Sequence, residues 1–488
     1  MCAGLPRRLR IAFGFVKSQA IPKRLPSLQE NLLSYESRNY NFLKSDRLCD
    51  PKVFGEAMAM AVLKKCFNLE KFSTLRDEVI GVSELATAQW AAKRDESQMR
   101  NVFKDFERRH LDIGADVSNF SLMVKRDAKV KLDDSCLAKH APAQNIMYHR
   151  KAINALYSPF FDEFKNRLLW CLNSNIVFFT EMSNADFASV VRRHVGDEDI
   201  YYMGEVDFSK FDKSQDAFIK EYERALYSAF GFDAEMLELW MYGEYRAHAT
   251  TTDGSLSFDV KNQRRSGGAN TWIGNSIVTL GILAMYYDVE NFKLLTISGD
   301  DSLIYSGTKI ANHSTQICLE TGFETKFMTP SVPYFCSKFL VHTGSFTYFV
   351  PDPYKLLVKL GAPSKYITDA GLFETFVSFR DLTRDLNNQL VVDRVAALVE
   401  EKYNFKSGFT IPAICALHCL RSNFLSYSKL YPVQRGFYNS TLSEIRSLRR
   451  LVPGLITTVY RCAGEKRYFS YLKSAIDEDP VPFTANRV

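Results

Sequence analysis

The clearest hydrophobic patterning lies in the middle of the chain. A β-rich run at 200–206 ends in Asp207, and the segment 214–230 then carries apolar side chains at helical spacing. Further along, the Gly-rich turn SGGANT precedes a second run of apolar positions with a helical period. Two short β-type runs follow, at 292–298 and 302–306, and they flank the sequence Gly-Asp-Asp. This stretch therefore predicts a β-hairpin with two carboxylates at its tip.

The flanking segments show weaker patterns. Residues 55–110 have helical periodicity, whereas 121–131 alternate imperfectly between apolar and basic residues, which indicates a strand or extended loop that carries several cations. A helix is expected at 309–322, β-rich runs follow it, and 365–488 are expected to be mostly helical. Because no Pro-, Gly- or Ser-rich linker stands out, we expect structural units that interleave along the chain.

Composition adds little to these expectations about fold and function. A chain of 488 residues suggests roughly three units of about 150 residues each. Lys and Arg number 62 against 56 Asp and Glu, and the net charge of +6 is compatible with a polyanionic partner without identifying one. Ten cysteines without a CxxC pair suggest reduced, intracellular thiols. The longest apolar stretch, near 273–287, falls short of a membrane span, so we expect a soluble chain.

Four aspartates are the first candidates for chemistry. Asp207 ends the predicted strand, Asp212 lies five residues on, and Asp300 and Asp301 occupy the hairpin tip. Strands that present carboxylates at adjacent ends can hold two hard cations about 4 Å apart, an arrangement suited to nucleotidyl transfer. Each motif alone is weak evidence, because Gly-Asp-Asp occurs by chance in about one protein in ten of this length, usually as a solvated turn.

The segment between the two acid motifs has the spacing SGxxxTxxxN. It contains Ser266, Gly267, Thr271 and Asn275. Its glycines allow a nucleic-acid strand to approach the backbone closely. A hydroxyl or amide beside Asp212 is suited to reading a ribose 2′-OH, which both donates and accepts hydrogen bonds. Helix capping would explain the turn alone, but the order of the three motifs favours the functional interpretation.

The segments DFSKFD, SGGANTWIGN and SGDDS resemble the three core palm motifs of RNA-directed RNA polymerases from positive-strand RNA viruses. Further segments, in the same order, resemble the alphavirus-like supergroup that includes plant tobamoviruses and closteroviruses: MVKRDAKVKLD, AQNIMYHRKAINALYSPFFDEF, GFETKF, PYFCSKFLV and DPYKLLVKLG. The resemblance covers about residues 120–362 and is greatest to closterovirus polymerases. In that group the polymerase is typically joined to an upstream replication protein by ribosomal frameshifting.

This resemblance implies an α+β right-hand polymerase with fingers, palm and thumb. The N-terminal extension and fingers would span 1–195, and the palm 196–345, with an antiparallel sheet plus helices. The catalytic core would lie at about 200–313, with 232–265 partly in the fingers. The mainly helical thumb would span 346–488.

The resemblance also implies roles for individual residues. Asp207 and Asp300 would be the principal Mg²⁺ ligands, with Asp301 a supporting acid and Mn²⁺ a substitute metal. Ribonucleotide selection would fall to Asp212, Ser266, Thr271 and Asn275, beside Gly267. The triphosphate would be held by Lys125, Lys129, Lys131, Arg150 and Lys151, although any one of these lysines could instead be a surface charge. Lys326 would be the general acid toward pyrophosphate, or else a solvated turn lysine.

The implied function is RNA-templated RNA synthesis from NTPs onto an RNA 3′-OH, for replication and transcription of a viral genome. The implied partners are template and product RNA and a viral methyltransferase/helicase protein, as a frameshift fusion or separate chain. The expected location is the host cytoplasm, in membrane-associated replication complexes, with only indirect membrane contact. A reverse transcriptase is one alternative, although such enzymes usually place a bulky aromatic where Asp212 stands and Tyr-x-Asp-Asp at the hairpin. A non-catalytic RNA-binding scaffold is the other.

Overall fold

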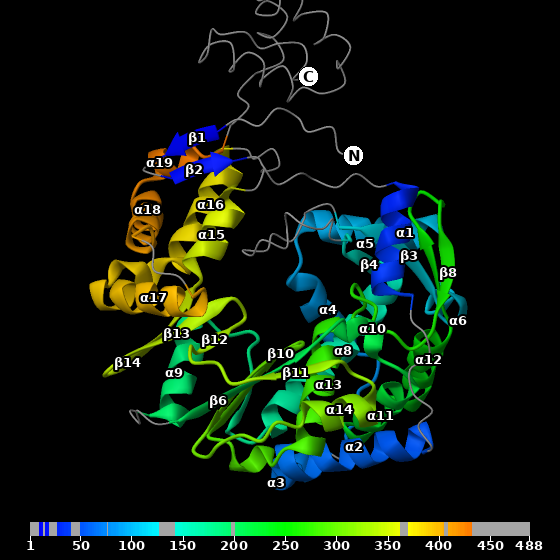
Figure 1. Cartoon of the computed structure of the whole chain (residues 1–488). Helices are drawn as coiled ribbons and strands as arrows, with labels where there is room; N and C mark the ends of the chain where they lie inside the picture. Colours follow the sequence, from blue (N-terminus) through cyan, green and yellow to red (C-terminus); the bar gives the residue numbers. More distant parts are fainter. Residues whose placement is uncertain are drawn as a thin grey trace, which may run out of the picture. The chain divides into compact units, whose positions relative to one another are not determined.

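The computed structural model describes residues 9–12, 15–18, 27–40, 49–75, 77–125, 142–196, 201–361, 369–404 and 408–431. The chain divides into two compact units, coloured along the sequence in Figure 1. The larger unit comprises residues 25–126 and 141–349, and the smaller unit comprises 1–24, 127–140 and 350–488. Both units are therefore discontinuous along the chain.

A five-stranded sheet with the strand order β11-β6-β10-β9-β5 lies at the centre of the larger unit. Neighbouring strands are antiparallel except β5 and β9, which run parallel. The predicted hairpin is confirmed, because β9 and β10 pair around Gly299, whose φ of 65° is a left-handed conformation that glycine adopts readily. The strands are β5 (Ile176–Phe178), β6 (Tyr202–Phe208), β9 (Leu294–Ser298), β10 (Asp301–Ser306) and β11 (Thr325–Met328).

Hydrophobic clusters cover both faces of this sheet, because side chains alternate between the faces along each strand. On one face, Val206 and Ile304 join the main core of the unit, and on the other, Leu303 and Tyr305 join a second cluster. The main core is built with α2 (Pro51–Cys66), α8 (Lys151–Cys171), α11 (Ala217–Ala229), α12 (Ala234–Tyr245) and α13 (Thr271–Tyr286). The second cluster includes residues of α9 (Asn184–Val195) and of a small sheet, β12 (Tyr334–Phe335), β13 (Lys338–Thr343) and β14 (Phe346–Pro351).

Helix α2 precedes the segments that carry the motif resemblance, at about 120–362, and it belongs to the main core. Its Met58 and Val62 are fully buried. Gly55 lets α2 approach α11 closely, since a Cβ at this position would lie 2.5 Å from both the carbonyl carbon of Glu221 and the amide nitrogen of Tyr222. Residues 51–66 therefore help to support the strands that carry the aspartates.

A second sheet in the larger unit has the order β4-β3-β7-β8, and only its β3–β7 pair is parallel. Its strands are β3 (Asn119–Val124), β4 (Asn145–His149), β7 (Ala247–Thr251) and β8 (Ser257–Val260). The predicted strand at 121–131 is thus found up to Val124, and residues 126–141 lie outside the described part of the chain. The remaining helices of the unit are α1 (Leu28–Arg38), α3 (Leu69–Thr74), α4 (Glu84–Ala92), α5 (Glu96–Arg108), α6 (Ile113–Asp116), α10 (Phe211–Ser214) and α14 (Ser314–Thr321), with the 3-10 turn η1 (Val289–Asn291).

The smaller unit combines one strand pair with a group of helices. Strands β1 (Leu9–Ala12) and β2 (Phe15–Ser18) are antiparallel. The helices are α15 (Pro353–Gly361), α16 (Asp369–Leu382), α17 (Gln389–Lys402), α18 (Thr410–Ser422) and α19 (Phe424–Ser428), with η2 (Arg384–Asn387). The helical prediction for 365–488 therefore holds up to Ser428, and residues 432–488 lie outside the described chain.

Mixed helices and mainly antiparallel sheets confirm the predicted α+β class. Among the described residues, every helix is too short or too polar to cross a bilayer.

Candidate active site

Three of the predicted aspartates lie at neighbouring ends of β6 and β10. The two strands pair antiparallel, with Ile304 opposite Gly204. Beyond this pair the Ser302 hydroxyl bonds the backbone of Val206, and the charge of Asp207 acts on Asp300 at the hairpin tip. Asp300 precedes β10 in the turn of the hairpin. Sequence alone placed these acids at strand ends, and the strand order β6-β10 makes those ends adjacent.

The hairpin tip is fastened to helix α13 by two buried hydroxyl groups that sequence reasoning did not single out. Ser276 Oγ accepts a hydrogen bond from the Gly299 amide at 2.9 Å, and Thr279 Oγ1 donates one to the Gly299 carbonyl at 2.9 Å. Trp272 Nε1, on the same helix, donates to Ser298 Oγ at 3.1 Å. The sequence does contain a sign of this role, because Ser276 and Thr279 are hydroxyl residues within an otherwise apolar helix.

Asp300 has an electrostatic environment typical of a functional acid. Desolvation raises its pKa to about 6, and the negative charges of Asp301, Asp212 and Asp207 act in the same direction. The residue lies at the exposed hairpin tip, where the repulsion from the neighbouring carboxylates adds to the effect of desolvation. Carboxylates that raise one another's pKa stabilise the binding of a cation between them.

Two further residues flank these acids. Lys326 of β11 lies directly opposite Asp207 in the antiparallel β6–β11 pair, and its side chain is exposed. The Cys336 thiol is within hydrogen-bonding reach of Ser298 and Asp301, and burial together with the charge of Asp301 raises its pKa to about 12. Cys336 is therefore a half-buried, protonated thiol beside the acids, as expected of a packing residue and not of a nucleophile.

The predicted ribose-selecting residues are only partly in mutual contact. Asn275 Nδ2 donates a hydrogen bond to Asp212 Oδ1 at 2.9 Å, which joins α13 to α10. Thr271 Oγ1 instead donates to the carbonyls of Arg265 and Gly268, both at 2.8 Å, within the turn that opens α13. The structure thus supports a carboxylate–amide pair as the centre of this group.

The SGG turn is packed against strand β4. Ser266 Oγ donates to the Asn145 carbonyl at 3.1 Å, and the Gly267 amide donates to the Met147 carbonyl at 2.8 Å. A Cβ at Gly267 would lie 2.8 Å from both the Met147 oxygen and the Tyr148 Cβ. In this structure the glycine therefore permits the close approach of a protein strand, whereas the sequence suggested the approach of nucleic acid.

The five basic residues predicted to hold a triphosphate have different surroundings. Lys125 and Lys151 have exposed side chains, whereas Lys129 and Lys131 lie outside the described residues. Arg150 is half-buried and paired within the protein: its guanidinium donates to Asp105 at 3.0 Å and to Asp116 at 2.7 Å, and also to backbone carbonyls of residues 105, 109 and 110. Its proposed contact with a phosphate stays a prediction.

Among the described residues, no three or more His, Cys, Asp or Glu side chains are grouped so that they could hold a metal ion by themselves. Mg²⁺ is usually held by one or two carboxylates together with water and substrate phosphates, so it does not require three protein ligands. The all-oxygen donor set of Asp207, Asp300 and Asp301, with its mutual repulsion, fits this kind of ion.

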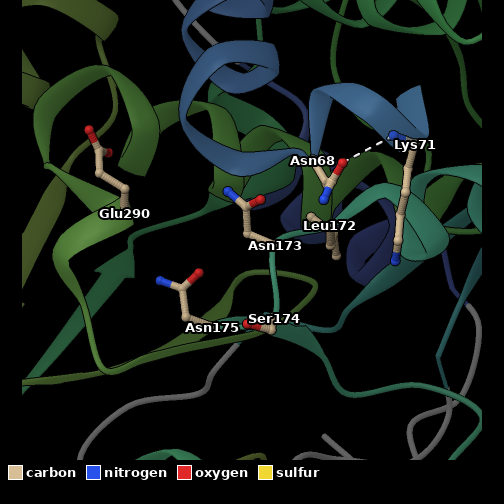
Figure 2. A pocket seen from close by; sticks show the side chains of 7 residues that line it. All are labelled: Asn68, Lys71, Leu172, Asn173, Ser174, Asn175 and Glu290. Carbon is tan, nitrogen blue, oxygen red and sulfur yellow. Dashed lines mark hydrogen bonds between the residues drawn. The ribbon is translucent and has the colours of Figure 1, made fainter. Parts of the chain in front are cut away.

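A separate pocket of about 610 Å³ lies on another part of the larger unit. Figure 2 shows that it is lined mainly by polar side chains: Asn68, Lys71, Leu172, Asn173, Ser174, Asn175 and Glu290. None of the predicted site residues lines it, so we do not assign the chemistry of the aspartates to this pocket.

The α+β fold, with aspartates at neighbouring strand ends, is compatible with the polymerase class that the motifs indicated, and comparison with known families makes the class specific. Residues 11–430 match the family described as RNA dependent RNA polymerase. The chain belongs to this family, which confirms the resemblance drawn from the motifs and the predicted enzyme class, RNA-directed RNA polymerase.

The similar proteins are replicases of plant viruses. The chain is 59% identical over 422 residues, 86% of its length, to replicase polyprotein 1ab of Beet yellows virus (isolate Ukraine). It is 34% identical over 446 residues, 90% of its length, to replicase polyprotein 1ab of Grapevine leafroll-associated virus 3. A third relative, 29% identical over 90% of the chain, is the methyltransferase/helicase/RNA-directed RNA polymerase of Raspberry bushy dwarf virus. The chain spans only 14%, 16% and 25% of these three proteins.

Proposed function

We propose that the chain synthesises RNA on an RNA template. An RNA 3′-OH would attack the α-phosphate of a base-paired NTP, forming a phosphodiester bond and releasing pyrophosphate. The observation that carries this proposal is the meeting of Asp207 with the Asp300–Asp301 hairpin on adjacent strands, close to the Asp212–Asn275 pair. Membership of the RNA-dependent RNA polymerase family supports the same reaction.

In this proposal Asp207, Asp300 and Asp301 would hold two Mg²⁺ ions. When bound, the metal supplies activation of the attacking hydroxyl and stabilisation of the charge on the leaving pyrophosphate. The protein contributes the rigidity of the acids: the Gly299 backbone is fastened to α13 by Ser276 and Thr279, so Asp300 is held in place before substrate binds. Mn²⁺ is expected to substitute for Mg²⁺.

The remaining predicted residues would bind and orient the nucleotide. Asp212 and Asn275 would read the ribose 2′-OH, with Ser266, Gly267 and Thr271 shaping the neighbouring turn. Lys326 would protonate the departing pyrophosphate from its position opposite Asp207. The triphosphate would be held by Lys125, Lys129, Lys131, Arg150 and Lys151.

The cellular setting is also a proposal. One relative carries methyltransferase and helicase in its printed name together with RNA-directed RNA polymerase. We propose that this chain works beside such functions, as a fusion or in a complex, in replication complexes on membranes of the host cytoplasm. Fingers, palm and thumb are likewise proposed for 1–195, 196–345 and 346–488.

The test is template-dependent incorporation of labelled nucleotides, with and without primer. We expect NTP incorporation by the wild type and its loss in Asp300→Ala, whereas Asp77→Ala, which removes an exposed acid from another part of the larger unit, should retain activity. Equal incorporation by Asp300→Ala would overturn the metal-site assignment. Equal use of dNTPs would favour a reverse transcriptase, and RNA binding without incorporation would favour the scaffold.

A further inference from the structure

A buried ionic cluster lies directly behind the Asp212–Asn275 pair. The side chains of Lys220, Glu223, Glu244, Arg264 and Arg265 are almost completely buried. Lys220 Nζ lies 2.7 Å from Glu223 and 2.8 Å from Glu244, Arg264 Nη2 lies 2.5 Å from Glu223, and Arg265 Nη1 lies 2.7 Å from Glu244. Replacing such a cluster with apolar residues is often neutral or stabilising, so stability alone is a weak explanation for it.

The cluster controls which way the Asn275 amide faces. Arg264 Nε and Gln215 Nε2 both donate to Asn275 Oδ1, each at 2.9 Å. This leaves Nδ2 as the group that faces Asp212. The reversed amide would place its NH₂ against two donors and its oxygen against a carboxylate, so the two donors together select one orientation.

Each of the two donors is itself held in place. Lys220 Nζ donates to Gln215 Oε1 at 3.5 Å, which directs the Gln215 amide nitrogen toward Asn275. The guanidinium of Arg264 packs flat against Gly274, one residue before Asn275. A Cβ at Gly274 would lie 2.5 Å from Nη1 and 2.6 Å from Cζ of that arginine. Arg264 can occupy this place only because residue 274 has no side chain.

We propose that Arg264 and Gln215 are positioning residues for sugar selection. They fix the Asn275 amide so that it donates to Asp212, and the carboxylate and amide then present a preset surface to the 2′-OH of the incoming ribonucleotide. The proposal rests on the proposed function and extends it to residues that the SGxxxTxxxN motif does not include. Gly274 contributes to the same orientation of Asn275, because it provides the space that Arg264 occupies.

The sharpest test changes Gly274 rather than a charged residue, because removing one buried ion would leave its partner uncompensated. Gly274→Ala keeps every polar group but displaces the Arg264 guanidinium. The readout is the ratio of kcat/KM for UTP to that for 2′-deoxy-UTP on an RNA template. We expect this ratio to fall at least about tenfold, the scale of one hydrogen bond to a charged group, through weaker use of UTP.

Gly281→Ala is the matched control. It lies on the same helix, and its Cβ would lie 2.8 Å from Tyr222 Cζ and even closer to Met58 Cε, away from the cluster. It should lower thermal stability as Gly274→Ala does but leave the UTP to 2′-deoxy-UTP ratio unchanged. If Gly274→Ala does not fold, Gln215→Met removes one donor to Asn275 while Lys220 keeps both glutamates, and the ratio should again fall.

The outcomes separate this inference from the proposed function. A wild-type protein that makes no RNA would overturn the proposed function. A wild-type protein that makes RNA, with an unchanged ratio in folded Gly274→Ala or Gln215→Met, would overturn the positioning role alone. A ratio that falls equally in Gly281→Ala would also overturn it, because crowding anywhere on α13 would then be sufficient.

Discussion

The environment of Asp300 differs from that of an ordinary surface acid. The pKa of an aspartate in an unfolded chain is about 4, whereas in the folded protein desolvation and the neighbouring acids raise the pKa of Asp300 to about 6. Between these two pH values the folded state binds more protons than the unfolded state. The contribution of Asp300 to the free energy of unfolding therefore decreases as the pH rises through this window.

We accordingly expect Asp300→Asn to gain stability relative to the wild type between pH 4 and pH 7 in metal-free solution. Urea denaturation at several pH values in the presence of a chelator measures this difference. Asp77→Asn changes an exposed acid. Its free energy of unfolding, relative to that of the wild type, should not increase as the pH rises from 4 to 7. A wild type that becomes more stable than Asp300→Asn as the pH rises would contradict the assignment. Addition of Mg²⁺ should reverse the trend above pH 6 by stabilising the ionised acids.

The glycines also show how far individual residues can be interpreted from sequence. The Gly-Asp-Asp turn was predictable because a hairpin of this kind needs a left-handed residue, and Gly299 supplies it. The roles of Gly267 and Gly274 were not, because the first depends on strand β4 and the second on a buried arginine. A glycine that is needed for close packing looks in sequence like a glycine that is needed for substrate.

Helix α13 connects the two halves of the candidate site. Asn275 reaches Asp212 from this helix, and the next residue, Ser276, holds the Gly299 backbone together with Thr279, one turn further on. Its apolar periodicity made the helix predictable, as alternation and turn residues did for β9 and β10. The association of this helix with α2 and the parallel pairing of β3 with β7 were not predictable, because both depend on contacts between distant segments.

Thr279→Val tests whether the anchoring of the hairpin by α13 matters for catalysis. The valine has nearly the same shape but leaves the buried Gly299 carbonyl without its hydroxyl donor, which should cost about 1–3 kcal/mol of stability. Because that carbonyl adjoins Asp300, we also expect kcat for nucleotide incorporation to fall by about tenfold or more.

Thr296→Val is the control in the same hairpin. Thr296 is also buried, and its hydroxyl donates to the Leu303 carbonyl at 3.2 Å, away from the tip. It should lower the free energy of unfolding by a similar amount without a matching loss of kcat. Equal losses of kcat in the two variants would mean that general destabilisation, and not the position of Asp300, limits the reaction.

The net charge of +6 conceals a division of charge within the larger unit. Acids converge at the ends of β6 and β10, whereas the exposed side chains of Lys125 and Lys151 flank the segment that carries further predicted phosphate ligands. A polymerase of this kind reads sequence through base pairing, so its own affinity for RNA should come mainly from the phosphate backbone. The affinity should then depend on a few placed cations and not on the total charge.

We therefore expect RNA binding to weaken steeply as salt concentration rises, with a log–log slope set by the number of phosphates contacted, about −0.7 for each one on a single strand. Lys125→Ala and Lys151→Ala should each weaken binding and make this slope shallower by roughly one contact. Lys52→Ala, an exposed residue of α2 that lies 4.0 Å from Glu56, should leave the slope unchanged. Fluorescence anisotropy of a labelled RNA over a salt series provides the measurement. If all three variants change the salt dependence of RNA affinity equally, the affinity depends on the overall charge of the protein. The proposed phosphate-binding role of Lys125 and Lys151 would then be wrong.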